Sequence, residues 1–307
     1  MKIFKNRGDI YIPKSGYKSS KEERILISLL VFIIIFTIVF LGLLSHKYSS
    51  ASQFFGEGEV EVTQNSDTDE IVLPEISGKT NYLIFETDDL NENIHYIYLI
   101  EADKDSMAYK VCALSPDTMI DDQSVTDIFS LGGGASLQTK MTEYFGFEID
   151  YFAQFTTSSF VEFANDLGSF VYPSNEEIKY SGGKADDTYT IHIKEGEQNI
   201  GGKELSNILR YYSKDKPNFE RANEIMLYAL TSLFNQDNYD DAQALFRLFI
   251  SSASTNITVR DFENGKDAIQ VFCYKNTDIT VYSCTAQYEK NIISQNSVQE
   301  IKGYFSK

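Results

Sequence analysis

Cysteine, histidine and proline are scarce in this 307-residue sequence, with three, three and five of them, and tryptophan is absent. Secreted domains that depend on disulfides carry more cysteine, and no Cys/His spacing suggests a zinc site. The spacing of Cys112, Cys273 and Cys284 leaves two interpretations open: a Cys273–Cys284 bridge, or three small buried apolar side chains. The signatures of P-loop proteins, dinucleotide-binding proteins, serine hydrolases and zinc proteases do not occur.

Positive charge is also scarce. Lys and Arg number 27 against 45 Asp and Glu, which gives a formal net charge of −18. A protein this acidic is poorly suited to general nucleic-acid binding, which needs cations to displace counterions from phosphates. An anionic ligand would have to be held by a local cluster of cations or by a metal. With 42% hydrophobic and 14% aromatic residues, the composition is that of a folded globular protein.

One long apolar run lies near the N-terminus. Residues 25–44 form an uncharged stretch of twenty residues. At about 1.5 Å per residue, a helix of this length spans the roughly 30 Å hydrocarbon core of a membrane. The alternatives are a buried helix, which is rarely apolar all round, and a cleaved signal peptide, whose apolar region is usually shorter. We therefore expect one uncleaved transmembrane helix at 25–44.

The flanking charges predict the orientation of this helix. Residues 1–24 contain seven cations and three acids, a charge of +4, which leaves −22 for the remainder. The positive-inside rule then makes 1–24 a basic cytoplasmic tail and places the bulk of the chain outside the cell. The polar, aperiodic residues 45–80 predict an extracellular stalk, and residues 81–307 predict the folded domain. The protein is expected in the cell membrane with a single pass.

Strand-like and helix-like segments alternate in the domain. The pattern predicts strands at 81–85, 95–102, 109–114, 170–173, 269–274 and 279–284, and helices at 136–145, 160–167, 203–212, 218–234, 242–252 and 297–305. The second and third strands are joined by a tight turn and should form a hairpin. This mixture in one block predicts a single three-layer α/β domain, with a mixed central sheet flanked by helices.

Carboxylates gather where the predicted strands end, at Asp88 and Asp89, at Asp117, and at Asp121 and Asp122. Ligands of open α/β sheets usually bind at strand ends, and carboxylate oxygens suit a hard cation such as Mg²⁺. Solvated loop acids are the alternative interpretation. Residues 132–134, the one run of three glycines, are expected to form a flexible turn before the helix at 136–145.

Five segments, in this order, resemble the LytR-CpsA-Psr family of bacterial envelope proteins. Residues 81–88 (Asn-Tyr-Leu-Ile-Phe-Glu-Thr-Asp) resemble the family's first strand, which ends in Gly, a small residue and Asp. Residues 111–118 resemble a strand that ends in Ile-Pro-Arg-Asp-Thr. The other three are 149–173, similar to a tyrosine segment, a Phe-bearing helix and a Leu-Gly-Gly-Val strand; 202–211, similar to a helix ending in Arg-Tyr-Arg; and 219–221, similar to Phe-Gly-Arg.

The resemblance covers residues 81 to about 305 and implies a function. Family members have a basic cytoplasmic tail, one membrane helix and an extracellular α/β domain. Active members transfer glycopolymers from a polyprenyl-pyrophosphate carrier to peptidoglycan, with arginines and Mg²⁺ neutralising the pyrophosphate and an apolar channel holding the lipid. The implied partners are therefore a polyprenyl-linked glycan or lipid, peptidoglycan and the membrane, but no nucleic acid.

The resemblance also assigns site residues. It implies Asp88, Arg210 and Arg221 as catalytic residues, which should converge around one pyrophosphate. Arg210 and Arg221, together with Tyr212 and Asp117, are implied as substrate-binding residues, and Asp88 with His95 as ligands of Mg²⁺.

The sequence departs from the family at several charged positions. Leu90, Pro116, Tyr212 and Glu224 stand where the family has arginines, and His95 stands where it has a metal-binding acid. Glu224 follows Arg221 by three residues on one helix face, so these two side chains could simply pair. The cationic positions that remain are Arg210 and Arg221.

Two functional hypotheses follow. The first is a glycopolymer phosphotransferase whose catalysis is weak or degenerate. The second is a non-catalytic protein that binds lipid-linked envelope precursors or envelope partners. An apolar tunnel beside Arg210 and Arg221 would favour lipid binding, and a filled core at that place would count against it.

Overall fold

The structure is a computed structural model, and it describes residues 71–184 and 187–306. The predicted cytoplasmic tail at 1–24, the predicted membrane helix at 25–44 and the first part of the stalk, 45–70, lie outside the described residues. In the part of the chain that is described, no helix has the length and hydrophobicity needed to cross a membrane.

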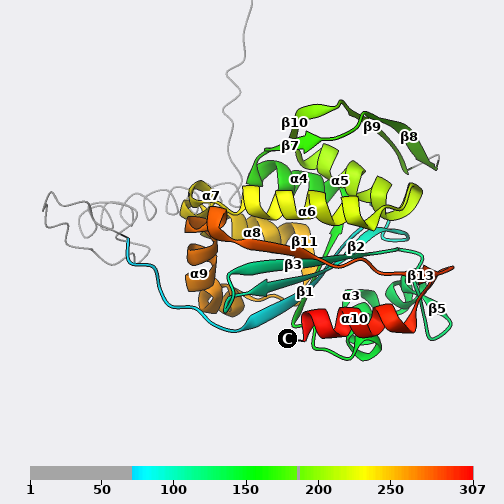
Figure 1. Cartoon of the computed structure of the whole chain (residues 1–307), viewed down its shortest axis with the longest axis horizontal. Helices are drawn as coiled ribbons and strands as arrows, with labels where there is room; N and C mark the ends of the chain where they lie inside the picture. Colours follow the sequence, from blue (N-terminus) through cyan, green and yellow to red (C-terminus); the bar gives the residue numbers. More distant parts are fainter. Residues whose placement is uncertain (1–70, 185–186, 307) are drawn as a thin grey trace, which may run out of the picture. The chain divides into compact units, whose positions relative to one another are not determined.

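A six-stranded mixed sheet forms the centre of the domain (Figure 1). Its strand order is β11-β6-β1-β2-β3-β12, with β1 Lys79–Thr87, β2 Ile94–Asp103, β3 Ala108–Leu114, β6 Tyr151–Thr156, β11 Ala253–Thr255 and β12 Thr280–Ser283. β1 pairs parallel with β6 and antiparallel with β2, and β12 runs parallel to β3. β2 and β3 form the antiparallel hairpin that the sequence predicts.

Helices cover both faces of this sheet, so the three-layer α/β prediction is confirmed (Figure 1). One face carries α4 Thr157–Leu167, α5 Gly202–Arg210 and α6 Phe219–Leu233; the other carries α3 Val125–Phe145 and α10 Gln295–Phe305. The side chains of β2 alternate between the two cores, as a strand buried on both faces requires. Tyr96 and Tyr98 pack toward α4, α5 and α6, whereas Ile97 and Leu99 pack toward α3 and α10.

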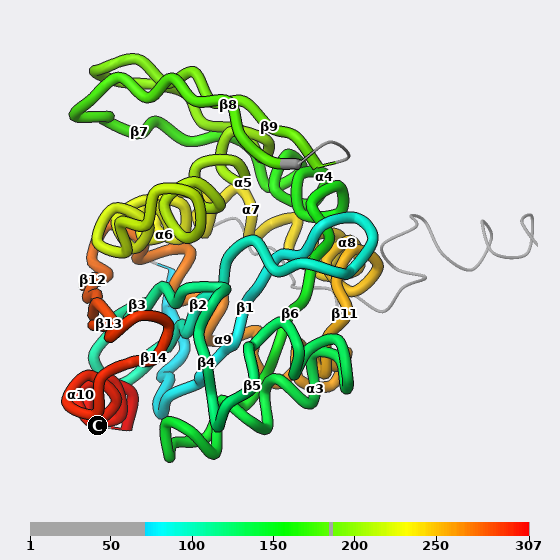
Figure 2. The backbone as a smooth tube through the Cα atoms, turned by 90° about the vertical axis from the view of Figure 1, so that its right-hand side faces the viewer, coloured from blue at the N-terminus to red at the C-terminus, as the bar shows by residue number. Residues whose placement is uncertain are grey.

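Smaller elements surround these layers. β7 Phe170–Ser174 pairs with β10 Gly196–Ile200, and β8 Ile178–Lys184 pairs with β9 Asp187–Ile193. These two ribbons lie beyond α4 and α5, on the side away from the central sheet (Figure 2). The remaining elements are β4 Met119–Ile120, β5 Gln123–Ser124, a π-helical turn Tyr211–Asp215, α7 Gln236–Asp240, α8 Ala242–Ser252, α9 Val259–Tyr274, a 3₁₀ turn Asn276–Asp278, β13 Tyr288–Glu289 and β14 Ile292–Ile293.

The strand predicted at 269–274 is wrong, because these residues form the end of α9. Their β-branched and aromatic side chains favour a strand locally. The helix begins at a capping box, in which the Thr258 side chain accepts from the Asp261 backbone N–H and the Asp261 carboxylate accepts from the Thr258 backbone N–H. Val271, Phe272 and Cys273 are buried in the helical conformation, so tertiary packing overrides the local preference.

The glycine run at 132–134 lies inside α3 rather than before it. The helix begins at Val125, where Ser124 and Asp127 form a capping box, so the predicted start at Ser136 is too late. Gly133 has a φ of 67° and interrupts the helix. A Cβ atom on Gly134 would lie 2.5 Å from the Phe152 ring, so the third glycine of the run allows α3 to approach β6.

All three cysteines are free thiols in the structure. Cys273 is buried in α9. Cys284 directly follows β12, its backbone N–H donates to the Val111 carbonyl of β3 at 3.0 Å, and its neighbour is Cys112. The hydrogen bond with Cys284, together with burial, raises the pKa of the Cys112 thiol. The interpretation as small buried side chains holds for Cys112 and Cys273, while Cys284 is half-buried.

Candidate functional site

A β-bulge between β1 and β2 brings the side chains of Glu86 and His95 together. Glu86 pairs with Tyr96 and Thr87 with Ile94, so His95 is the extra residue of β2. A bulge turns the extra residue away from regular alternation, and His95 consequently lies on the same side as Glu86, facing α4 and α5. The His95 Nδ1 atom is 3.1 Å from Oε1 of Glu86, and both side chains have no exposed surface.

Glu86 is held by three donor groups. Besides His95, the hydroxyls of Thr157 and Ser206 each donate to its Oε1 atom at 3.0 Å. Thr157 is the first residue of α4, and Ser206 lies in α5. These donors make up for part of the hydration that a buried carboxylate loses.

The second nitrogen of His95 faces another carboxylate. Its Nε2 atom is 3.0 Å from Oδ2 of Asp187, the first residue of β9. Both ring nitrogens are therefore within hydrogen-bond distance of a carboxylate oxygen. His95 thus links a carboxylate of the central sheet to a carboxylate of the β8–β9 ribbon.

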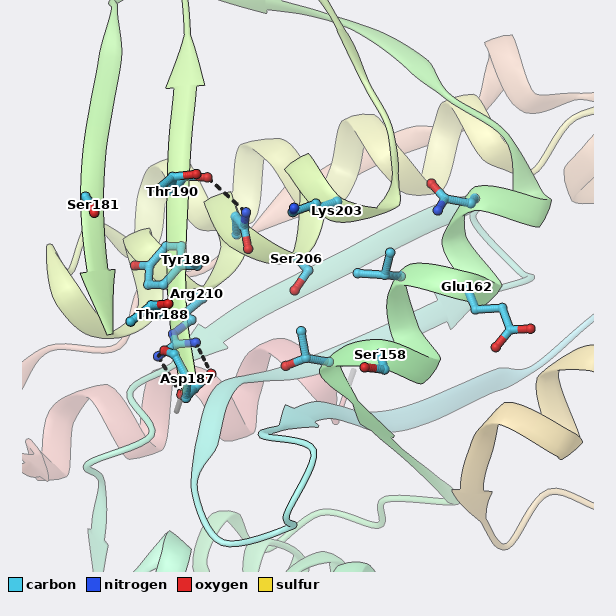
Figure 3. Close-up of a pocket in the computed structure, with 14 residues that line it drawn as sticks. Ser158, Glu162, Ser181, Asp187, Thr188, Tyr189, Thr190, Lys203, Ser206 and Arg210 are labelled. Carbon is cyan, nitrogen blue, oxygen red and sulfur yellow. Dashed lines mark hydrogen bonds and ion pairs between the residues drawn. The ribbon is translucent and has the colours of Figure 1, made fainter. Parts of the chain in front are cut away.

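Arg210 completes this chain of charges at the end of α5. Its two terminal nitrogens donate to the two carboxylate oxygens of Asp187 at 2.7 Å each, which is a bidentate pair (Figure 3). The guanidinium also lies over the ring of Tyr189, 4.4 Å from its centroid. The Arg210 side chain is 7% exposed and that of Asp187 is 32% exposed, so Asp187 forms the solvent-facing end. We call Glu86, His95, Asp187 and Arg210 the charge chain.

A groove with a volume of about 950 Å³ opens beside the charge chain (Figure 3). Its walls come from α4, α5 and the β8–β9 ribbon. The lining is mostly hydroxyl, amide and charged side chains, with few apolar ones: Thr157, Ser158, Val161, Glu162, Asn165, Ser181, Asp187, Thr188, Tyr189, Thr190, Lys203, Ser206, Asn207 and Arg210. Such a surface offers many donors and acceptors to a polar ligand.

The carboxylate of Asp88, the first residue assigned to catalysis, is hydrogen-bonded within the β1–β2 turn. It accepts from the backbone N–H of Glu92 at 2.7 Å and from the Asn93 side chain at 2.6 Å. Burial alone would raise the pKa of Asp88, but these hydrogen bonds outweigh burial and hold the pKa below its ordinary value. Asp88 therefore stabilises the β1–β2 turn through both of its carboxylate oxygens.

Arg221, the other predicted cation, pairs with Glu224. Their side chains are 2.6 Å apart within α6, as the spacing of three residues allows. The hydrogen bond with Glu224 raises the pKa of Arg221, with burial acting against it. No contact among the described residues joins Arg221 to Arg210 or Asp88. The structure therefore links His95 to Arg210 through Asp187, and gives no direct contact for the predicted convergence of Asp88, Arg210 and Arg221.

Tyr212 and Asp117, the remaining predicted binding residues, lie outside the groove lining. The hydroxyl of Tyr212 donates to Glu176 at 2.9 Å, and the ring is buried. Asp117 is exposed in the loop after β3, where its backbone N–H donates to the Ser115 hydroxyl at 3.1 Å. Neither side chain contacts the charge chain.

The residues that the resemblance implies for Mg²⁺ do not fit that ion here. Mg²⁺ demands oxygen ligands in near-octahedral positions. The Asp88 oxygens accept from amides, and each His95 nitrogen faces a carboxylate already. Within residues 71–184 and 187–306, no group of three or more acids, histidines or cysteines has an arrangement suited to a metal. The Mg²⁺ expectation stays a prediction, and no step below depends on it.

Sequence reasoning missed Asp187, Glu86 and Ser206. Glu86 had a signal, since it is a charged residue at the end of an apolar strand where the family has glycine. Asp187 had none, because it follows an aperiodic stretch and reaches Arg210 only through the β8–β9 pairing. Ser206 is one of several polar residues of α5, and its orientation depends on how the helix packs.

The layer between the central sheet and α5 and α6 is filled. Among the described residues, side chains in this layer with no exposed surface include Tyr98, Ile208, Leu209, Ala222 and Ile225. The Tyr98 hydroxyl also donates to the Ala222 carbonyl at 2.9 Å. A passage wide enough for a lipid chain would leave its walls accessible, so this packing counts against a lipid tail at this place.

The chain belongs to the LytR-CpsA-Psr family, because the model of the LytR_cpsA_psr family matches residues 61–304. This confirms the resemblance found in the sequence. A search of curated proteins gave no match.

Solved structures have the same fold at low sequence identity. A putative transcription regulator from Eubacterium siraeum is 16% identical, with a TM-score of 0.66 over 80% of this chain and 99% of that chain. TagV of B. subtilis is 14% identical, with a TM-score of 0.58 over 75% of this chain and 97% of that chain. TagT bound to LI-WTA is 14% identical, with a TM-score of 0.55 over 82% of this chain and 96% of that chain.

Proposed function

We propose that this protein is a membrane-anchored, extracellular member of its family that binds the glycan part of an envelope glycopolymer and transfers it weakly or not at all. The observation that carries the proposal is the bidentate Asp187–Arg210 pair. The Asp187 carboxylate pairs with Arg210, and among the described lining residues Arg210 is the arginine, the side chain whose planar guanidinium suits phosphate. Arg221 is engaged in the same way by Glu224.

The groove supports a sugar ligand. Sugar hydroxyls both donate and accept, and they match the serine, threonine and asparagine side chains of the lining. A volume of about 950 Å³ is at the upper end of the size that small-molecule sites usually have, roughly 300–1,000 Å³. A polymer of low local charge suits a domain whose own charge is strongly negative. The filled layer beneath the groove favours recognition of the polymer over recognition of its lipid carrier.

Glycan binding is expected to depend on the open volume of the groove. Val161 lies on its α4 wall, so Val161→Trp should fill the groove and weaken binding of lipid-free envelope glycan fragments by roughly tenfold or more. Ser169→Trp places the same ring at an exposed position outside the lining and should bind like the wild type. The measurement is calorimetric titration of full-length protein in detergent.

Two results would contradict this proposal. One is equal glycan affinity in both tryptophan variants. The other is a polyprenyl phosphate that co-purifies with the protein, detected by native mass spectrometry, together with no affinity for the lipid-free glycan. The second result would favour a lipid-linked precursor as the ligand.

The anchor is proposed from the sequence at 25–44. The charge step from the basic residues 1–24 to the acidic remainder orients the domain to the outside. Protease added to intact cells should therefore degrade the domain and leave a short N-terminal fragment. A domain that stays protected until the cells are lysed would reverse this orientation.

A further inference from the structure

Asp187 occupies the position of a bound anion. Its carboxylate accepts from both terminal nitrogens of Arg210 at 2.7 Å and faces His95 Nε2 at 3.0 Å. A planar fork with a third donor beside it is the arrangement that proteins offer to carboxylate and phosphate ligands. In this chain the anion comes from the protein itself.

The donors around this carboxylate are fixed independently of it. Arg210 lies over the Tyr189 ring, and its Nε atom is buried and has no hydrogen-bond partner among the described residues. His95 is held at Nδ1 by Glu86, and Glu86 is held by Thr157 and Ser206. Removal of the Asp187 carboxylate would therefore leave a preorganised, buried and positively charged position.

That position opens to solvent through the groove. Asp187 lines the groove and its side chain is 32% exposed, whereas His95 has no exposure and Arg210 has 7%. A ligand in the groove therefore meets the carboxylate of Asp187 before it meets Arg210 or His95. Repulsion by this carboxylate acts on any phosphate that approaches.

We propose that Asp187 is the specificity-determining residue of the groove: it occupies the anion position formed by Arg210 and His95, and so restricts the groove to uncharged stretches of a polymer. The inference rests on the proposed function, because it assigns a ligand class to the same groove. Charge balance supports it. The charge of Arg210 is offset by Asp187, so a phosphate in the groove meets no uncompensated guanidinium, and the other cation among the described lining residues is Lys203.

The test compares pyrophosphate binding in wild-type and variant protein. Inorganic pyrophosphate is titrated into full-length protein in detergent, and binding is followed by calorimetry. We expect no saturable binding to the wild type in the millimolar range. Asp187→Asn removes the charge at nearly constant shape, and it should tighten pyrophosphate binding by roughly tenfold or more, the equivalent of one charge-assisted hydrogen bond. Asp187→Ser should act in the same direction.

Two controls separate the anion position from a change in overall charge. Glu195→Gln removes one negative charge from an exposed side chain without a described contact, and should leave pyrophosphate binding at the wild-type level. The double variant Asp187→Asn/Arg210→Gln should lose the gained binding. Circular dichroism and thermal melting establish that each variant is folded.

The outcomes separate this inference from the proposed function. Saturable pyrophosphate binding by the wild type that needs Arg210 would overturn the inference, and this measurement does not depend on the folding of Asp187 variants. Folded Asp187 variants without any gain would overturn it as well, while glycan binding by the wild type would leave the proposed function intact. If the wild type binds no glycan and Asp187→Asn gains pyrophosphate, the proposed function fails and the role of Asp187 stands.

Discussion

Replacement of Glu86 by alanine is expected to lower the free energy of unfolding by about 3–5 kcal/mol, the cost of removing one partner of a buried ion pair. The variant would remove the carboxylate that faces His95 Nδ1 and accepts from Ser206, whereas the Thr157 hydroxyl would keep the Thr87 carbonyl as an acceptor. Each of these groups lost its hydration when the domain folded, and an unmade buried hydrogen bond costs about 1–3 kcal/mol. The missing side-chain volume adds a cavity.

Chemical denaturation of the variant measures this loss, and two further variants test the cause. Glu86→Gln keeps the volume and one acceptor oxygen, so it should cost less than Glu86→Ala. The double variant Glu86→Leu/His95→Phe replaces the pair by apolar side chains and should recover much of the stability, because a buried ion pair and a packed apolar pair are often close in energy. Losses that simply add in the double variant would show that the two side chains are not coupled.

Glycopolymer transfer by this protein is expected to be at least about a thousandfold slower than transfer by a family member with the full set of arginines, since a single arginine in a phosphoryl-transfer site is worth about 10³–10⁵ in rate. The positions that resemble family arginines are Leu90, Pro116, Tyr212 and Glu224. The side chains of leucine and tyrosine carry no positive charge. Leu90 is 71% exposed, and the Tyr212 hydroxyl donates to Glu176.

The two arginines that remain are not available to a phosphate. Arg210 is paired with Asp187 and Arg221 with Glu224. A transition state that spreads charge over phosphate oxygens needs donors that are in place beforehand. The assay uses a short-chain lipid-linked donor, an acceptor glycan, and either Mg²⁺ or Mn²⁺. Turnover equal to that of the arginine-complete relative, measured side by side, would show that these ion pairs open during catalysis.

The sequence predicted the central layers because their signals are local. The apolar runs of β1, β2 and β3 and the 3.6-residue periodicity of α4 and α6 were visible without tertiary information. The strand predicted at 269–274 was wrong for the opposite reason. Its composition favours a strand, but the helix begins at the Thr258 cap, eleven residues before this segment, and continues through it.

The candidate site was predicted only in part, because it depends on pairing between distant segments. Arg210 and His95 were identified through the family pattern, and both belong to the charge chain. Asp187 joins them across 92 and 23 residues, and the bulge at His95 is a matter of strand register. The pairing of Arg221 with Glu224 could be read from the sequence, since it depends on helical spacing alone.

The β8–β9 ribbon has its own two-stranded sheet, separate from the six-stranded one. Tyr189, Ile191 and Ile193 of this ribbon belong to the same hydrophobic core as α5, whereas Asp187 lines the groove. Aspartate and asparagine codons differ by one nucleotide, so a single point mutation at this ribbon would alter the charge presented to a ligand. In this fold, a groove that binds sugars and a groove that binds phosphates would therefore differ by the single substitution Asp187→Asn.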